Sequence, residues 1–320
     1  LVDYQSGSYL KFEANENYYK GEPSIKNVVF QIIENADTAI LALQNGEVDA
    51  YQMTPQQVKK LDLDASNLST YSYSEGRVGY LEINCNRVTD EKVRKALLYA
   101  MDRKAMDDAA FESSEYYSIP YTFLPTNSQF YTEDGVEKYE QDVDKAKSML
   151  EDAGVSGLKL KLGYMSSDAV QSAQALLIQE QLKEVGVTVE LAGGDGTAIA
   201  NAMKDPDNEY DMYLGGYIMG IDPDTFSSLF ENDGAYNYMH YSGYDTIDQL
   251  FEEGRSELDE SARKETYAKL QAAVQDTGAF YPIISNNKIL VVNNRIQGVE
   301  DAGLVPVYTF EDTSSLKIAE

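Results

Sequence analysis

Apolar residues recur along this chain with two periods, every second residue in some segments and every third or fourth in others. The first period is typical of half-buried strands and the second of amphipathic helices. The expected strands lie at residues 9–14, 26–33, 48–51, 68–73, 78–84, 158–164, 187–191, 211–214, 280–285 and 289–293. The expected helices lie at residues 36–44, 142–153, 168–185, 197–203, 244–255 and 260–276, and two more follow Thr54 and Asp90. This mixed order, without an internal repeat, predicts an α/β protein.

Several predicted helix ends carry residues that stabilise helix termini. Thr54 and Asp90 each precede a helical stretch, and their side-chain oxygens are predicted to cap its first turn. Gly154 and Gly186 follow two other helices, where glycine tolerates the left-handed backbone of a C-terminal cap. These signals set boundaries that the apolar period alone leaves open.

The longer-range order favours two lobes. Residues 158–191 have the pattern strand, helix, strand, which predicts a parallel crossover. Residues 111–131 are rich in Tyr, Pro and Ser and show no period, so we expect a long loop there. If the chain leaves one lobe, builds another and returns, strand-like connections near Asn84 and Ser285 would form a hinge.

The segment around Gly215 and Gly216 concentrates the candidate chemistry. A strand over residues 211–214 is expected to stop at this glycine pair and to open into an aromatic and acidic loop. Such a loop suits the mouth of a binding cleft. Because the chain has 25 tyrosines and no tryptophan, tyrosine is the expected aromatic residue of any pocket.

Composition excludes several classes of partner. The 320 residues include 54 Asp and Glu against 26 Lys and Arg, a formal net charge of −28. This balance argues against nucleic acid and against a basic face for anionic lipid. No apolar run approaches the roughly 20 residues of a membrane helix, and the first residues do not resemble a signal peptide.

The residues needed for metal or nucleophilic chemistry are scarce. His240 is the only histidine and Cys85 the only cysteine, so we expect no metal site, no cofactor and no internal disulfide. The sequence also has no G-x-S-x-G nucleophile motif. These absences count against an enzyme, so we expect none, and a hydrolase on a two-lobed scaffold is kept as the rival class.

A series of motifs resembles one known family in its order along the chain. The helix at residues 93–103, VRKALLYAMDR, resembles the signature helix of the family 5 extracellular solute-binding proteins, the oligopeptide, dipeptide and nickel-type binding components of ABC importers. Further similar elements are LALQNGEVD at 41–49, KAKSMLEDAG at 145–154, QLKEVGV at 181–187, DPD at 222–224, YD at 244–245 and the helix at 259–270. Together they cover nearly the whole chain.

The resemblance implies a fold and its limits. It implies a periplasmic-binding-protein type II-like α/β fold, with two α/β lobes joined by a hinge. Residues 1–84 and 285–320 would form lobe one and residues 85–284 lobe two. Because members of the family are longer, the resemblance also implies an N-terminally truncated chain whose first lobe is incomplete.

The resemblance also implies ligand-binding residues in the loop after the glycine pair. Tyr217 stands where the family has an aromatic ligand contact, and Met219 and Asp222 follow it. Peptide binders of the family hold the peptide α-amine with an acidic residue shortly after that aromatic. Here the loop is one residue shorter and lacks the acid at that position, so Asp222 would substitute for it. Alternatively, Asp222 only caps the helix that follows.

Three further candidates have structural alternatives. Asn237 and Tyr238 stand where the family has an Asn–aromatic pair facing the cleft, although a tyrosine-rich surface loop would look the same. Asn84 lies at the proposed crossover, where a hinge or ligand-amide role competes with a simple turn.

The function that the resemblance implies is capture of a small peptide-like ligand in an interlobe cleft and its delivery to the permease subunits of an ABC importer. The location would be extracytoplasmic, at the cell surface or in the periplasm. Contact with the membrane would be only through a lipoprotein anchor in the missing N-terminal part. A sugar or a metal chelate as ligand, or a role as a ligand sensor, are the alternatives.

Overall fold

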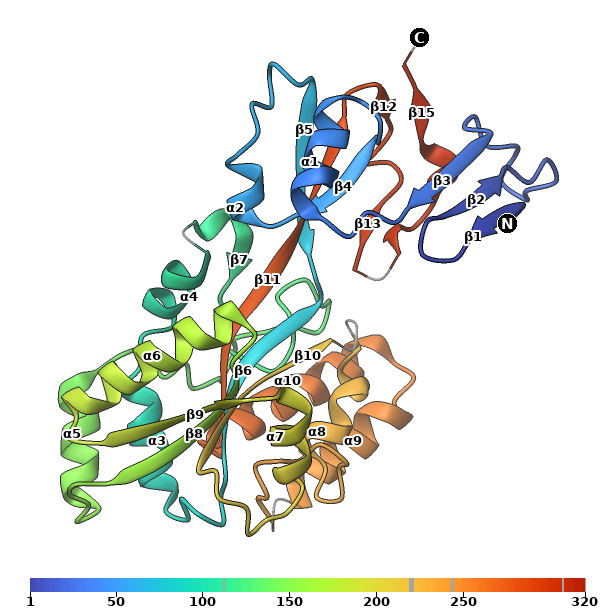
Figure 1. Cartoon of the computed structure of the whole chain (residues 1–320). Helices are drawn as coiled ribbons and strands as arrows, with labels where there is room; N and C mark the ends of the chain where they lie inside the picture. Colours follow the sequence, from blue (N-terminus) through green and yellow to red (C-terminus); the bar gives the residue numbers. More distant parts are fainter. Residues whose placement is uncertain (112, 219–221, 243–244, 307, 320) are drawn as a thin grey trace. The chain divides into compact units, whose positions relative to one another are not determined.

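The computed structural model describes residues 1–111, 113–218, 222–242, 245–306 and 308–319. The chain forms two compact units (Figure 1). Unit 1 comprises Leu1–Glu75 and Asn287–Glu320, and unit 2 comprises Gly76–Asn286. No helix of the described residues is both long enough and apolar enough to cross a membrane.

The described residues of unit 1 form small antiparallel sheets, two α-helices and one short 3-10 helix. Its elements are β1 (Asp3–Gln5), β2 (Tyr9–Glu13), β3 (Asn27–Gln31), α1 (Ala36–Gln44), β4 (Ala50–Met53), α2 (Pro55–Val58), β5 (Leu68–Ser74), β12 (Ile296–Gln297), β13 (Leu304–Val305), β14 (Thr309–Phe310), η3 (Thr313–Ser315) and β15 (Lys317–Ile318). β1, β2 and β3 form a three-stranded sheet in that order. β4 and β5 pair with the second half of β11 (Phe280–Asn293), and β12–β15 and β13–β14 form two-stranded sheets.

Unit 2 contains a mixed sheet with helices on both faces. Its elements are β6 (Arg77–Ile83), α3 (Glu91–Tyr99), α4 (Arg103–Phe111), η1 (Ser114–Tyr116), β7 (Tyr117–Ser118), α5 (Val143–Asp152), β8 (Lys159–Met165), α6 (Ala169–Glu184), β9 (Thr188–Gly194), α7 (Gly196–Ala202), β10 (Met212–Ile218), η2 (Pro223–Phe226), α8 (Ser227–Phe230), α9 (Asp245–Ser256) and α10 (Glu260–Asp276). The sheet order is β11-β6-β10-β8-β9, and β7 also pairs with β11.

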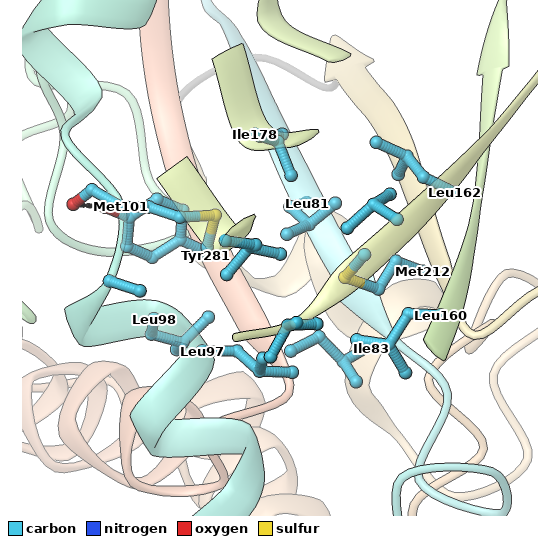
Figure 2. Packing of buried hydrophobic residues seen from close by; sticks show 14 of the residues in the cluster. Leu81, Ile83, Leu97, Leu98, Met101, Leu160, Leu162, Ile178, Met212 and Tyr281 are labelled. Atoms are coloured by element: carbon cyan, nitrogen blue, oxygen red, sulfur yellow. Dashed lines mark hydrogen bonds between the residues drawn. The ribbon is translucent and has the colours of Figure 1, made fainter. Parts of the chain in front are cut away.

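The strand pleat divides the core of unit 2 between two faces of this sheet. On β6, Leu81 and Ile83 point to one face and pack with residues of α3, α6 and β8. Figure 2 shows Leu97, Met101 and Tyr281 in the same cluster. Val78 and Tyr80 belong to the second cluster, which α8, α9 and α10 cover. The central strands are thus buried on both sides.

The helix that carries the family resemblance is built around a buried arginine. Arg94 of α3 is 3% exposed and donates hydrogen bonds to the carbonyls of Thr277 (2.9 and 3.2 Å), Val88 (3.0 Å) and Thr89 (3.0 Å). These bonds connect α3 to the end of α10 and to the loop before α3. The motif therefore has a structural role in this chain.

Most predicted elements are confirmed, including the helix ends. α1 has the predicted bounds, Thr54 and Asp90 cap α2 and α3, and Gly154 and Gly186 adopt left-handed backbone after α5 and α6. The predicted crossover is also confirmed, because β8 and β9 are parallel neighbours connected through α6.

Three predictions about local structure differ from what the structure shows. Residues 280–293 form one strand and not two, because the polar residues 286–288 interrupt the apolar pattern but not the strand pairing. The strand expected at residues 48–51 lies at Ala50–Met53. The loop predicted at residues 111–131 contains η1 and β7.

The α-helix α4 has no counterpart among the predicted elements. α4 was missed because its buried positions are Arg103, Met106 and Asp107, two of which are charged. A helical period that depends on apolar residues cannot detect such a face.

Candidate ligand-binding site

The glycine pair of β10 serves close packing and does not end the strand, contrary to the prediction. β10 continues through both glycines to Ile218, antiparallel to β6 and parallel to β8. A Cβ atom on Gly215 would lie 2.5 Å from the Tyr80 ring, and one on Gly216 would overlap the Arg77 guanidinium group. Glycine is therefore required because side chains of β6 lie across β10.

Tyr217 belongs to a series of four tyrosine rings. Its hydroxyl is hydrogen-bonded to the Ser228 hydroxyl at 2.7 Å. Its ring centroid lies 6.1 Å from that of Tyr236, which lies 6.2 Å from Tyr238, which in turn lies 6.0 Å from Tyr213. Two predicted site residues, Tyr217 and Tyr238, are thus connected through the ring of Tyr236. Such aromatic contacts favour a fixed arrangement of the rings.

A buried carboxyl group lies beside this series and was missed at the sequence level. Glu82 pairs in register with Tyr213 and is 0% exposed, and neither carboxyl oxygen has a hydrogen-bond partner among the described residues. Burial raises its pKa well above the usual range, so the neutral form is favoured. Burial also raises the pKa of Tyr213 and Tyr238 to about 12 each. In the sequence, the only sign of this buried group was one acidic residue within a predicted strand that is otherwise mostly apolar.

Asp222 has two structural partners. Its carboxylate accepts a hydrogen bond from the backbone N–H of Asp224 at 3.0 Å and so caps η2, as the structural alternative predicts. Both carboxylate oxygens also lie 3.1 Å from Nη2 of Arg263. A ligand amine would therefore share this carboxylate with an arginine. Met219, the third candidate of this loop, lies outside the described residues.

A polar cavity of about 380 Å³ within unit 2 contains the predicted Asn–aromatic pair. Asn237 and Tyr238 line it together with Lys204, Asp233 and His240. Asn237 Nδ2 donates to the Glu231 carbonyl at 3.1 Å, and its Oδ1 is buried without a partner among the described residues. Tyr217, Asp222 and Asn84 are not among the described residues that line the cavity.

Asn84 has the turn role that was considered as its structural alternative. It is 0% exposed, accepts from the backbone N–H of Asn86 at 3.0 Å and donates to the Pro206 carbonyl at 3.4 Å. Its backbone N–H donates to the Asp211 carbonyl. These bonds hold the end of β6 against the segment before β10. A ligand role for Asn84 stays a prediction.

Metal-ligating side chains do not gather in the described part of the chain. No cluster of three or more His, Cys, Asp and Glu side chains occurs there. Cys85 is partly buried, and burial raises the pKa of its thiol to about 11, which keeps it protonated near neutral pH.

Comparison with known proteins identifies the family. The model of bacterial extracellular solute-binding proteins, family 5 (middle region), matches residues 1–238. The chain therefore belongs to the family 5 extracellular solute-binding proteins. The crystal structure of the ABC transporter substrate binding protein CtaP from Listeria monocytogenes is similar over the whole chain, with a TM-score of 0.92 and 37% identity. The fold is thus the type II periplasmic-binding-protein fold.

The names of two curated relatives refer to different ligands. The oligopeptide-binding protein AppA of Bacillus subtilis is 26% identical over 91% of this chain. The nickel-binding periplasmic protein of Escherichia coli is 23% identical over 99% of it. The chain spans 56% and 64% of these relatives and 66% of the CtaP structure.

Proposed function

We propose that this chain is part of the solute-binding component of an ABC importer and holds a small peptide-like ligand. The observation that carries the proposal is the family match over residues 1–238, joined to the similarity with an oligopeptide-binding relative. The proposed partners are the ligand and the importer's permease subunits. The role is ligand capture without catalysis, in an extracytoplasmic location and with a lipid anchor outside this chain as the only membrane attachment.

The proposal includes a two-lobe division and a set of contacts. As proposed from the sequence, residues 1–84 with 285–320 would form lobe one and residues 85–284 lobe two. The compact units of the structure divide at Glu75 and Gly76 and at Asn286 and Asn287 instead, which puts β6 in unit 2. Tyr217, Met219, Asp222, Asn237, Tyr238 and Asn84 are the proposed ligand-binding residues. The tyrosine series that includes Tyr217 and Tyr238 supports this choice, because tyrosine rings pack against varied side chains while their hydroxyls form hydrogen bonds.

A metal chelate is the second candidate ligand. The similarity to a nickel-binding relative over nearly the whole chain favours it. A sugar ligand, a sensor role and a hydrolase activity have no such observation in their favour.

The test is a binding measurement with the purified protein. Short peptides, sugars and nickel chelates are screened by thermal shift, because a ligand that binds only the folded state stabilises it by RT ln(1 + [L]/Kd). We expect a shift with peptides and a Kd that calorimetry can measure. A shift only with chelates or sugars would replace the ligand class, and no shift with any of them would overturn the binding role.

Two variants then locate the ligand. Asp222→Asn retains the oxygen that caps η2, since Asn is as good an N-cap as Asp, but it removes the charge. We expect peptide affinity to fall at least tenfold if the carboxylate binds the α-amine. Tyr217→Ala should also weaken binding, whereas Tyr308→Ala, at an 81% exposed tyrosine, serves as the matched control. Unchanged affinity in both site variants would remove these residues from the proposed site.

A further inference from the structure

The three-stranded sheet of unit 1 (Figure 1) has one apolar face and one largely polar face. Because side chains alternate between the two faces of a strand, the pairing register places the even-numbered residues of β1, β2 and β3 on one face. These residues are Tyr4, Leu10, Phe12, Val28 and Phe30, and all are aliphatic or aromatic. Of the eight odd-numbered residues on the opposite face, six are polar or charged.

Two further residues continue this apolar face beyond the strand ends. The backbone N–H of Val2 donates to the Lys11 carbonyl at 2.9 Å, and that of Ile32 donates to the Ser8 carbonyl at 2.7 Å. The strand pairing and its alternation therefore extend to both residues. The apolar face thus carries seven aliphatic or aromatic side chains from three short segments.

The apolar face is open to solvent in the described part of the chain. Tyr4, Phe30 and Ile32 are 66%, 60% and 47% exposed, and Leu10 and Phe12 on the central strand are half-buried. An antiparallel sheet with one apolar face commonly packs that face on a core and leaves the polar face in water. A contiguous exposed apolar surface, unlike scattered apolar residues, marks an interaction site.

The sheet holds this face in a defined arrangement. The rings of Phe12 and Phe30 are in edge-to-face contact, with centroids 5.8 Å apart. The connection between β2 and β3 is attached to the C-terminal part of unit 1, because Lys20 pairs with Asp312 at 2.8 Å and Ser24 Oγ donates to the carbonyl at residue 316 at 2.7 Å. The face is therefore ordered before any partner covers it.

The size of the face and the length of the relatives indicate what covers it. Seven side chains are far fewer than the roughly 20–30 residues that each partner contributes to a stable interface between separate chains. A segment of the same polypeptide needs less area, because its attachment makes the contact intramolecular. The CtaP structure matches the whole of this chain, whereas the chain covers 66% of CtaP, so about a third of that relative has no counterpart here.

We propose that the apolar face of β1, β2 and β3 binds an apolar segment of the longer solute-binding protein, from the part that lies outside these 320 residues. The segment would bury the exposed rings of Tyr4 and Phe30 and so give this sheet the second layer that it lacks among the described residues. The inference goes beyond the proposed function, because it concerns an interface within the binding protein and holds for any ligand.

Adjacent residues of β3 provide a matched comparison of the two faces. Phe30 and Val29 are 60% and 56% exposed in this chain but lie on opposite faces. Phe30→Cys and Val29→Cys are made in a Cys85→Ser background, in the 320-residue chain and in the full-length protein, and the rate of maleimide labelling is measured. In the 320-residue chain the two rates should agree within about threefold, whereas in the full-length protein Phe30→Cys should react at least about tenfold more slowly than Val29→Cys.

Charged substitutions test the same contrast through stability. Phe30→Lys should lower the Tm of the full-length protein by at least about 5 °C, because the segment would then cover a charge, whereas Val29→Lys should lower it by less than about 2 °C. If Phe30→Cys does not fold, Tyr4→Cys on the apolar face and Gln5→Cys on the opposite face give the same comparison on β1.

The other outcomes overturn the inference. Equal labelling rates in the full-length protein would show that the apolar face stays open there. Slow labelling of Phe30→Cys in the 320-residue chain at every protein concentration would show that the chain covers its own face, and slow labelling only at high concentration would assign the face to a second copy. Because no ligand enters these measurements, they can fail while peptide binding is observed, and peptide binding can fail while they succeed.

Discussion

The strands β3 of unit 1 and β6 of unit 2 have similar apolar content but opposite surroundings. All five residues of β3 are exposed, and Val29 and Phe30 are 56% and 60% exposed. In β6, six of the seven residues are buried, and Leu81 and Ile83 are 0% exposed. The difference shows that an apolar strand pattern specifies a strand but not the layers that cover it. We therefore expect substitutions in β6 to lower the free energy of unfolding more than substitutions in β3.

The largest expected effect comes from removing core volume from β6. Leu81→Ala should lower the free energy of unfolding by about 3–4 kcal/mol, since it loses buried apolar surface and leaves a cavity. Val29→Ala in β3 should change it by less than about 0.5 kcal/mol, because the side chain is already largely in water. Urea unfolding monitored by circular dichroism measures both. Equal losses in the two variants would show that the exposure of β3 does not describe the protein in solution.

Buried and exposed arginines extend the comparison to polar groups. Arg94→Met in unit 2 should cost about 2–4 kcal/mol, because the buried carbonyls of Thr277 and Val88 and the part-buried carbonyl of Thr89 lose their donor. Arg295→Met in unit 1 removes an exposed ion pair with Asp49 and should cost under about 1 kcal/mol. The same urea experiment applies. A small loss for Arg94→Met would indicate that water replaces the guanidinium group in the interior.

The contrast between local features and features that depend on neighbouring layers also explains which parts of this structure could be predicted from the sequence. Caps and apolar periods are local, so α1 and the ends of α2, α3, α5 and α6 were predictable. The role of Gly215 depends on the Tyr80 ring of a neighbouring strand, and no local pattern contains that information. α4 was missed because charged residues occupy its buried face.

The candidate site was predictable in residue type more than in arrangement. Tyr217 and the Asn237–Tyr238 pair were named as candidates, and the structure places that pair in one cavity. Asp222 pairs with Arg263, which lies 41 residues away in the sequence, and the Glu82 carboxyl group has no hydrogen-bond partner among the described residues. Both features depend on the tertiary structure and could not be predicted from local sequence.

One carboxyl group in each unit should make the free energy of unfolding depend on pH, and the two dependences should have opposite signs. Asp107 in unit 2 is 0% exposed, and burial raises its pKa to about 8. The folded state then binds a proton that the unfolded state has released, so this group's stabilising contribution is complete below pH 3.8 and is lost as pH rises through 8. The slope is roughly 1 kcal/mol per pH unit. Asp107→Asn should flatten that part of the stability profile between pH 5 and 7.

Asp312 in unit 1 provides the opposite case. The hydrogen bond from Lys20 at 2.8 Å lowers the pKa of Asp312 to about 2. Its contribution is therefore present above pH 3.8 and disappears as pH falls through 2. Asp312→Asn should differ from the wild type near pH 6 and converge with it below pH 2. A parallel offset at every pH in both variants would contradict the assigned causes.

The smallest effects are expected at helix caps, where the two units should behave alike. Asn35 Oδ1 accepts from Thr38 N–H at 2.9 Å at the start of α1, and Asp168 Oδ1 accepts from Val170 N–H at 2.8 Å at the start of α6. Each bond satisfies a donor that the helix itself cannot, so replacement of either residue by alanine should cost about 1 kcal/mol. Urea unfolding of both variants measures these losses.

The cap comparison sharpens the contrast between the units, because a cap acts locally while burial depends on neighbouring layers. If Asn35→Ala costs far less than Asp168→Ala, α1 must already be frayed in the folded chain. Unit 1 would then have low local stability in α1 as well as in the exposed strand β3. If the two losses agree, unit 1 has ordinary local structure, and only the covering of its three-stranded sheet distinguishes it from unit 2.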